Sequence, residues 1–366
     1  MARAGPIPFA EYLDLALYDP DGGFFGAGGG AGREGHFLTS PEVGPLFAAV
    51  LARAIDGWWA DLGRPDPFVV VEAGAGTGSL ARDVLAAGPR CGPALRYVLV
   101  ERSDALRGHQ AGRLSLEVPA LALGPSVPDD EDGPGAAQAS GPLTTSLPSF
   151  PAGPLTGVIV ANELLDNLAF LLLERRSDGW DEVRVGWGAD GPVEVLVPAA
   201  AELAAEAGVL APAAPVGGRI PLQRDAATWL REAASALERG RIVVVDYADA
   251  SPSLARRPWR DWVRTYRGHQ RGGHPLDDPG SQDITCEVAV DQLVRVRAPL
   301  ADRSQAEFLS AHGIEELVAG ARSGWLEGAA AGTLEALRHK SRLGEAAALV
   351  DPTGLGTFRV LEWVID

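Results

Sequence analysis

The sequence predicts an α/β fold with an open, mostly parallel sheet. Three observations lead to this prediction. Apolar β-branched runs alternate with segments of helical periodicity, and one of these runs opens directly into a glycine-rich turn and a helix. Several runs also end in acidic or amide residues, and ligands of open α/β sheets bind beyond the carboxyl ends of the strands.

The predicted elements follow one another along the whole chain. A helical segment and a glycine-rich stretch come first, and a second helix starts at Thr39, where a hydroxyl cap precedes Pro41 and Glu42. Residues 124–154 are rich in Pro, Gly, Ala, Ser and acids, which suits a surface insertion without packed elements. We expect helices at 9–17, 39–59, 79–85, 224–237 and over much of 305–349, and strands at 68–72, 96–101, 155–160, 180–187, 193–197, 241–246 and 357–364.

Composition limits the classes of partner. A chain of 366 residues can bury a large core, as one domain with insertions or as two domains. The formal charge of −17 argues against a nucleic-acid partner, because binding to the phosphate backbone needs clustered Lys and Arg. Two cysteines, Cys91 and Cys286, are too few for a disulfide framework or a metal site. The early acids do not fit a signal or transit peptide, and no apolar run is long enough to span a membrane. We therefore expect a cytoplasmic protein with no membrane partner.

The segment Phe68–Leu80 is the most informative part of the chain, because a β-branched run passes into alternating glycines and then a helix. Gly74, Gly76 and Gly78 supply backbone that adopts positive φ and lets a ligand approach without a Cβ in the way. Their G-x-G-x-G spacing differs from the dinucleotide pattern, and no Lys-Ser/Thr pair follows to hold a triphosphate. NAD and ATP are therefore disfavoured. The plain alternative is a tight turn that binds nothing.

Two acids at strand ends complete this pattern. Glu72 closes the strand before the glycines, and Glu101 closes the next strand, 96–101. Together with the glycine turn they resemble the S-adenosylmethionine site of Rossmann-like methyltransferases. This resemblance implies that Glu101 binds the ribose hydroxyls and that the turn lies beneath the methionine part of the cofactor.

Further polar residues follow two other predicted strands. Asn162 and Glu163 come at the tip of one strand, and Asp166 lies one turn further on if a helix begins there. Asp246 and Tyr247 follow a third apolar run. The carboxyl ends of parallel strands meet at one edge of the sheet, so we expect these acids to share a rim. Taken singly, each acid is as well explained by a helix cap or a solvated loop charge.

Seven sequence blocks, in order, resemble the MidA-like methyltransferases. That family includes the mitochondrial arginine methyltransferase that assists assembly of respiratory complex I. The resemblance covers residues 6 to 363, and agreement over several ordered blocks is more specific than any single motif. The blocks are Tyr18–Phe24, Gly35–Glu42, Glu72–Leu80, Ala161–Asp166, Arg264–His269, Asp278–Thr285 and Gly354–Leu361.

The resemblance implies S-adenosyl-L-methionine as cofactor and a set of residues that bind it. A loop at Thr39, Ser40, Pro41 and Glu42 would close over the cofactor, and the remaining binding positions are Glu72, Gly74, Gly76, Gly78, Glu101 and Asn162. No metal is implied. The implied architecture is a Rossmann-like class I methyltransferase core, with an N-terminal helical segment and an inserted α+β substrate subdomain. Its expected parts are 1–62, which caps the cofactor site, the core at 63–173, an insertion at 174–240, and the rest of the core with inserted loops at 241–366.

The resemblance also suggests how an arginine substrate would be held. Glu163 and Asp166 are the candidates for a pair of carboxylates that bind a guanidinium bidentately. His269 is a candidate proton acceptor in a loop over the active site that also includes residues 264–268, 282 and 283; its alternative is a hydrogen-bonded structural histidine. The expected partner is a protein substrate, and the resemblance is compatible with a homodimer.

One departure from the family pattern keeps other functions open. Leu164 and Leu165 stand where the family usually has two phenylalanines, next to the Asn-Glu block. This change, together with the insertion at 124–154, would suit a methyltransferase for a small molecule or a peptide. A third hypothesis is a non-catalytic assembly protein that keeps the nucleoside pocket, although the intact acids argue against it.

Overall fold

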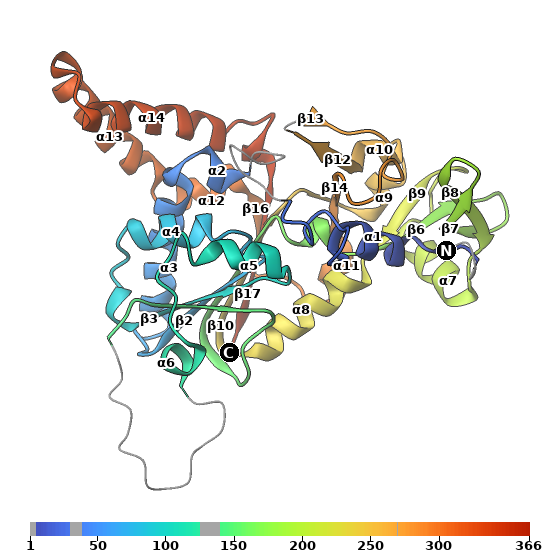
Figure 1. The fold of residues 1–366 in the computed structure, drawn as a ribbon, viewed down its shortest axis with the longest axis horizontal. Helices are drawn as coiled ribbons and strands as arrows, with labels where there is room; N and C mark the ends of the chain where they lie inside the picture. Colours follow the sequence, from blue (N-terminus) through green and yellow to red (C-terminus); the bar gives the residue numbers. More distant parts are fainter. Residues whose placement is uncertain (1–4, 30–38, 125–139, 269) are drawn as a thin grey trace, which may run out of the picture. The chain divides into compact units, whose positions relative to one another are not determined.

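The computed structural model describes residues 5–29, 39–124, 140–268 and 270–366 (Figure 1). Contacts within the chain divide it into two compact units. The core unit comprises residues 38–162, 233–245 and 299–366, and the second unit comprises 1–37, 163–232 and 246–298. Across the described ranges, no helix combines the length and the apolar character that a membrane span needs. The four segments expected from the sequence stay a prediction.

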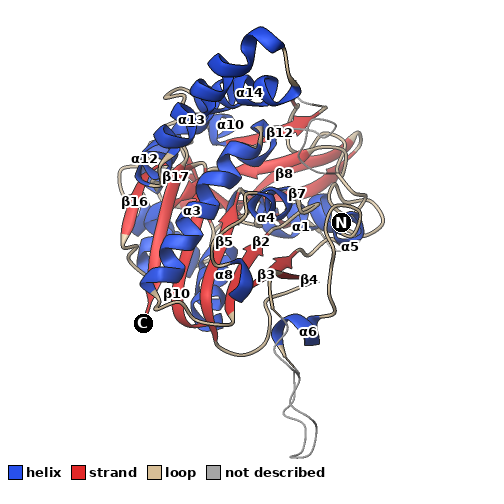
Figure 2. Cartoon of the chain, turned by 90° about the vertical axis from the view of Figure 1, so that its left-hand side faces the viewer, coloured by secondary structure: helices blue, strands red, loops and turns tan. Residues whose placement is uncertain are grey.

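The core unit contains a seven-stranded sheet with the order β16-β17-β10-β5-β2-β3-β4 (Figure 2). The neighbouring strands from β10 to β4 in this order are all parallel, whereas β16 pairs antiparallel with β17. The predicted α/β fold with a mostly parallel sheet is therefore confirmed. The strands are β2 (Phe68–Ala73), β3 (Leu95–Val100), β4 (Leu143–Leu147), β5 (Leu155–Asn162), β10 (Leu237–Asp246), β16 (Ala301–Ser304) and β17 (Arg359–Ile365).

The order of the strands reverses beside β2. The chain runs from β2 outward through β3 and β4, and it then returns to the other side of β2 with β5 and β10. Such a switch point leaves a crevice at the carboxyl ends of the central strands, where ligands of open α/β sheets bind. Strand β2 is buried along its whole length, as a Val-rich central strand of a parallel sheet should be. Gly157 in β5 permits the close pairing with β2, because a Cβ there would lie 1.8 Å from the Val69 carbonyl oxygen.

Helices cover this sheet. Helix α3 runs across β5 and packs against α4, and α13 and α14 form a long antiparallel pair (Figures 1 and 2). The short helix α2 packs against α3, α4 and α14. The helices of the core unit are α2 (Ser40–Val43), α3 (Pro45–Asp61), α4 (Ser79–Ala86), α5 (Asp104–Gln110), α6 (Pro119–Leu123), α12 (Gln305–Ala311), α13 (Ile314–Gly328) and α14 (Leu334–Leu349), with 3-10 turns η1 (Gly92–Ala94), η3 (Ala329–Ala331) and η4 (Leu355–Thr357).

The second unit is built on an antiparallel sheet with the order β1-β7-β6-β9, to which β8 is added beside β7. The predicted pairing of strands near 180–187 and 193–197 is confirmed, because β7 and β8 form a hairpin. Helix α1 packs on β6, β7 and β14, and residues 224–232 of α8 are assigned to this unit. The strands are β1 (Ile7–Pro8), β6 (Leu171–Arg175), β7 (Trp180–Gly188), β8 (Gly191–Pro198), β9 (Arg219–Leu222), β11 (Ala248–Asp249), β12 (Val263–Arg267), β13 (Gln270–Arg271), β14 (Asp283–Cys286) and β15 (Val288–Ala289). The helices are α1 (Phe9–Tyr18), α7 (Ala201–Leu210), α8 (Arg224–Ala236), α9 (Ser251–Leu254), α10 (Trp259–Trp262) and α11 (Val290–Val296), with the 3-10 turn η2 (Leu165–Asn167).

Two predicted elements differ from the structure. The helix expected at 39–59 is broken at Gly44 into α2 and α3, because the Glu345 carboxylate approaches there and accepts the Leu46 N–H at 3.0 Å. Thr39 precedes α2 as expected, but its hydroxyl makes no capping hydrogen bond. The segment 124–154, expected to lack packed elements, contributes strand β4, whose Thr145 is fully buried. Residues 125–139 of that segment lie outside the described part of the chain.

Candidate active site

The glycine turn lies between β2 and α4 at the carboxyl edge of the core sheet. All three of its glycines have positive φ, with values of 71° at Gly74, 51° at Gly76 and 80° at Gly78. The N–H groups of Gly74 and Ala75 donate to the carbonyl of Val100 at 2.9 and 3.1 Å, which folds the turn toward the end of β3. A Cβ placed on Gly76 would meet no atom of the chain within 4 Å. The backbone of the turn is therefore accessible to a ligand at this point.

Glu101 lies directly against this turn. Its Oε2 accepts the Gly76 N–H at 2.9 Å and its Oε1 accepts the Ser103 N–H at 2.8 Å, which fixes the orientation of the carboxylate. Burial raises the pKa of Glu101, whereas these backbone hydrogen bonds and the charge of Arg107 lower it. A carboxylate has about four acceptor directions, and two backbone donors leave capacity for the hydroxyl groups of a ligand.

A second pair of side chains supports the turn and was not identified from the sequence. Gln110 in α5 donates from Nε2 to the Gly76 carbonyl at 2.7 Å, and its Oε1 accepts the Ser146 hydroxyl at 2.6 Å. Gln110 is fully buried although it is polar. A buried glutamine inside an amphipathic helix is the signal that could have indicated this role.

Glu72 is buried within the sheet at the end of β2. Its Oε2 accepts the Tyr97 hydroxyl at 2.7 Å. Burial raises the pKa of Glu72 to about 8, although the hydrogen bond from Tyr97 opposes this shift. The carboxyl group is therefore mainly protonated at neutral pH, and its predicted part in cofactor binding stays a prediction.

The other predicted cofactor residues of the core unit lie in α2 and β5. Ser40 is fully buried, and its hydroxyl donates to Gln305 Oε1 at 2.8 Å. Thr39 is buried at the start of α2, and Pro41 occupies its first turn. Asn162 is the last residue of β5, one residue beyond the pairing of Ala161 with Ala73 of β2. Their part in binding the cofactor stays a prediction.

A group of buried acids lies in the second unit. Asp246 accepts the N–H groups of Leu165 at 3.0 Å and of Asp166 at 3.3 Å through Oδ2, and the N–H of Tyr247 at 2.9 Å through Oδ1. The first two bonds hold the 3-10 turn η2, which carries Asp166 at the point where the sequence left open whether a helix begins. Glu163 precedes η2 with φ of 49°, a conformation that a residue with a Cβ seldom adopts.

Asp283 joins this group from a distant part of the sequence. It opens β14, it is fully buried, and its Oδ1 accepts the Nδ2–H of Asn167 at 2.8 Å. The same amide donates to the Ile284 carbonyl at 3.2 Å. In the antiparallel pair of β12 and β14, Tyr266 stands opposite Asp283. The expected loop over the active site is therefore wrong for residues 264–267 and 283, which are paired strands, and His269 lies outside the described residues.

The acids of this group have raised pKa values. Burial raises the pKa of Asp166 to about 7, and it raises the pKa of Asp246 and Asp283 well above the usual range, with a further increase from the charge of Asp166. The positive charge of Arg264 lowers the pKa of Asp166. Arg264 itself is paired with Glu287 at 2.5 Å. The group is thus electrostatically suited to receive a cation.

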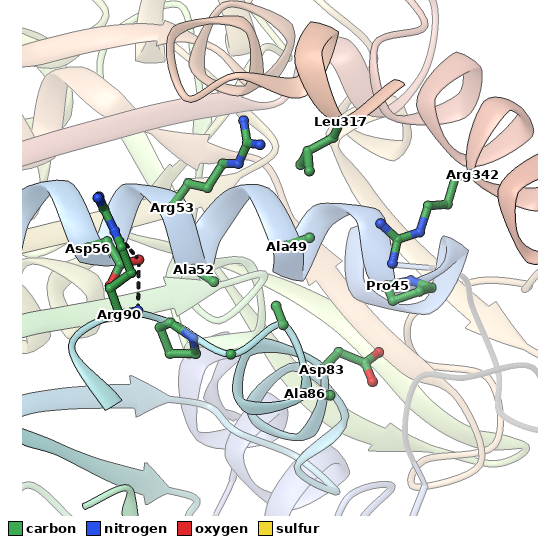
Figure 3. A pocket seen from close by; sticks show the side chains of 13 residues that line it. Pro45, Ala49, Ala52, Arg53, Asp56, Asp83, Ala86, Arg90, Leu317 and Arg342 are labelled. Atoms are coloured by element: carbon green, nitrogen blue, oxygen red, sulfur yellow. Dashed lines mark hydrogen bonds and ion pairs between the residues drawn. The ribbon is translucent and has the colours of Figure 1, made fainter. Parts of the chain in front are cut away.

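Two further observations concern other kinds of site. Among the residues that the structure describes, no group of three or more His, Cys, Asp or Glu is placed to hold a metal ion. A cavity of about 680 Å³ opens in the core unit between α3, the end of α4, α13 and α14 (Figure 3). Arg53 and Arg342 border it, and Asp56 anchors its floor by accepting the N–H groups of Arg90 and Cys91, each at 2.9 Å. No predicted site residue lines this cavity, so it is separate from the glycine turn.

Comparison with known proteins gives a family and a set of relatives. Residues 50–304 match the family described as "Putative S-adenosyl-L-methionine-dependent methyltransferase". The chain is 28% identical over 300 residues to "Protein arginine methyltransferase NDUFAF7 homolog, mitochondrial" of Drosophila melanogaster, a match that covers 78% of this chain and 65% of the relative. It is 26% identical over 325 residues to the Danio rerio protein arginine methyltransferase NDUFAF7, mitochondrial, with coverage of 85% and 74%. The chain therefore spans about two thirds to three quarters of the length of these relatives.

Solved structures agree with this relationship. A protein from Burkholderia thailandensis that is described as a likely methyltransferase, crystallised with S-adenosyl-homocysteine, superposes with a TM-score of 0.79 at 27% identity. The match covers 100% of this chain and 89% of that one. The native crystal structure of a protein of the same superfamily and organism gives a TM-score of 0.78. The relatives' names also correct one prediction. Because the relatives from both animals are named mitochondrial, the cytoplasmic location expected from the sequence is wrong.

Proposed function

This chain belongs to the family of S-adenosyl-L-methionine-dependent methyltransferases that its residues 50–304 match, and we propose that it transfers a methyl group to an arginine side chain of a protein. The observation that carries the choice of acceptor is the group of buried acids around Asp166, which is suited to a cationic side chain. The names of the relatives support the same acceptor.

The core unit supplies residues that fit the cofactor. The backbone at Gly76 is accessible, and the oriented carboxylate of Glu101 lies against the same turn, as binding of ribose hydroxyls requires. Glu101 and the glycine turn would hold the nucleoside. Once bound, the cofactor supplies a methyl group attached to a sulfonium. Because the rest of the cofactor would leave as a neutral thioether, its departure needs little help from an acid or a base.

The acids of the second unit would bind and orient the acceptor. A guanidinium is planar and carries five N–H donors, so two carboxylates can hold it by paired hydrogen bonds and fix the orientation of its nitrogens. Glu163 and Asp166 are the proposed ligands. The guanidinium pKa lies above 12, so the acceptor nitrogen loses its proton only as the new C–N bond forms. A nearby carboxylate, or His269, would receive this proton.

Methyl transfer with labelled cofactor tests this proposal. The purified chain is incubated with S-adenosyl-L-methionine that carries a deuterated methyl group and with an extract from cells that lack the gene, and peptides and metabolites are then examined by mass spectrometry. We expect label on arginine, lost in Glu163→Gln and Asp166→Asn while S-adenosyl-homocysteine binding persists. The proposed acceptor is wrong if the label appears on a small molecule or on another side chain. Transfer to a small molecule would favour the alternative that Leu164 and Leu165 suggest.

A further inference from the structure

We propose that Asp283 is a second carboxylate of the guanidinium site and acts together with Asp166, so that the site accepts a cationic acceptor and rejects a neutral one of the same shape. This inference rests on the proposed arginine acceptor. It adds Asp283 of β14, which lies 117 positions after Asp166 in the chain.

The first support is that two carboxyl groups each have one oxygen without a hydrogen-bond partner among the residues that the structure describes. Asp166 and Asp283 are 3% and 0% exposed, and in the described part of the chain Asp166 Oδ1 and Asp283 Oδ2 are buried without a hydrogen-bond partner. Buried polar atoms are nearly always hydrogen-bonded, so each such atom in a native fold calls for an explanation. Two unpartnered acceptors in one group indicate a ligand with at least two donors.

The second support is that the surrounding contacts fix the positions of both acids. Asn167, the residue after Asp166, donates from Nδ2 to Asp283 Oδ1, so Oδ2 is the oxygen of this carboxyl group that has no partner within the described ranges. Asp246 accepts the N–H groups of Leu165 and Asp166, which holds the backbone at Asp166 in place. The two acids are close enough that the charge of Asp166 raises the pKa of Asp283. Such a preorganised pair loses little conformational freedom when it binds a ligand.

The third support concerns the charge of the ligand. Two ionised carboxylates in this buried position repel each other and are poorly solvated, so without a ligand they retain protons. A neutral ligand supplies no positive charge, whereas a guanidinium supplies the donors and one positive charge, which balances one ionised carboxylate of the pair. The nearby cation Arg264 already pairs with Glu287. Binding of the acceptor should therefore release a proton from the acid pair to solvent.

Binding of a matched pair of small probes tests the inference. The full chain, saturated with S-adenosyl-homocysteine, is titrated with N-acetyl-arginine amide and with N-acetyl-citrulline amide, its neutral counterpart of nearly the same shape. Wild type is compared with Asp283→Asn and with Asp181→Asn, a control that alters a buried acid of the same unit on β7. Calorimetry at pH 6.5 in buffers of different ionisation enthalpy counts the protons released on binding.

We expect wild type and Asp181→Asn to bind the arginine compound at least tenfold more tightly than the citrulline compound and to release a proton. Asp283→Asn should bind the arginine compound at least tenfold more weakly, release less proton, and keep its affinity for S-adenosyl-homocysteine. Because asparagine resembles the protonated acid, its midpoint of thermal unfolding at pH 6 should not fall. Thermal destabilisation without a change in arginine discrimination or proton release would show a purely structural role and overturn the inference.

A second readout separates this inference from the proposed function. Arginine methylation of extract proteins is measured with wild type and Asp283→Asn. If both methylate arginine with equal kcat/KM, the role of Asp283 is wrong and the proposed function stands. If wild type labels no arginine and binds the two probes equally, the arginine acceptor fails and the inference fails with it.

Discussion

Replacing Glu72 by glutamine should change how the stability of the protein depends on pH. The Glu72 carboxyl is buried in β2, and its pKa is about 8 in the folded protein against an ordinary value of 4.5. Between these values the folded protein retains a proton that the unfolded chain has lost. Because the folded state binds more protons, the free energy of unfolding falls as the pH rises from 4.5 through 8.

The size of this effect follows from the shift in pKa. A difference of about 3.5 units corresponds to about 5 kcal/mol at high pH, at 1.36 kcal/mol for each unit. About 3 kcal/mol of this loss falls between pH 6 and pH 9. Glutamine does not titrate, and its carbonyl oxygen can still accept the Tyr97 hydroxyl. Glu72→Gln should therefore lose about 3 kcal/mol less stability than wild type over this range.

Urea denaturation of the cofactor-free protein at pH 6 and pH 9 measures this difference. The other buried acids contribute equally to wild type and variant, so only the difference between the two pH dependences matters. Tyr97→Phe is the matched perturbation in the opposite direction. It removes a hydrogen bond that lowers the pKa of Glu72, and stability should then fall more steeply toward pH 9. Equal pH dependences for wild type and Glu72→Gln would refute the reasoning.

Three further predictions concern the two sites. Gly76→Ala and Gly88→Ala should each cost about 1 kcal/mol of stability, because both glycines have positive φ and open space at the Cβ position. Calorimetry should show a tenfold loss of S-adenosyl-homocysteine affinity only for Gly76→Ala. Asp246→Asn removes part of the hydrogen bonding that holds η2, so denaturation should show a loss of about 1–3 kcal/mol of stability. Steady-state assays should show a lower kcat, with unchanged affinity for the cofactor. The kcat/KM of arginine methylation should fall about tenfold for each pH unit below pH 7, because the protonated, neutral carboxyl group of Asp166 cannot form an ion pair with a guanidinium. A kcat/KM that does not change with pH would contradict this.

Local sequence patterns were sufficient to predict the parallel strands β2, β3, β5 and β10 and the glycine turn of the core unit. The strand that begins at Phe68, the glycine turn and α4 are consecutive in the sequence. A buried strand, a turn with positive φ and an amphipathic helix each have a local sequence pattern, so each could be predicted. The sequence also placed Glu101 at the end of the next predicted strand, and the structure adds that its carboxylate accepts the Gly76 N–H. The α/β class and the hairpin of β7 and β8 were predicted from local patterns as well.

Contacts between distant residues could not be predicted in the same way. Asp283 meets Asn167 only because β14 packs against η2, and no periodicity in the sequence encodes that packing. The break at Gly44 depends on Glu345, which belongs to α14. Strand β4 was missed because its short Leu-Thr-Thr-Ser-Leu sequence, at 143–147, follows a compositionally biased segment, and its burial comes from its neighbour β3.

Titration of the chain with S-adenosyl-homocysteine, for wild type and Glu101→Gln, tests the cofactor site most directly. A hydrogen bond to a charged group contributes about 1.5–3 kcal/mol, so loss of the carboxylate should weaken binding by roughly 10- to 100-fold. We expect wild type to bind one S-adenosyl-homocysteine per chain, and a control, Glu117→Gln, to bind with unchanged affinity. Absence of binding to wild type, or equal affinities for wild type and Glu101→Gln, would contradict the placement of the nucleoside on the glycine turn.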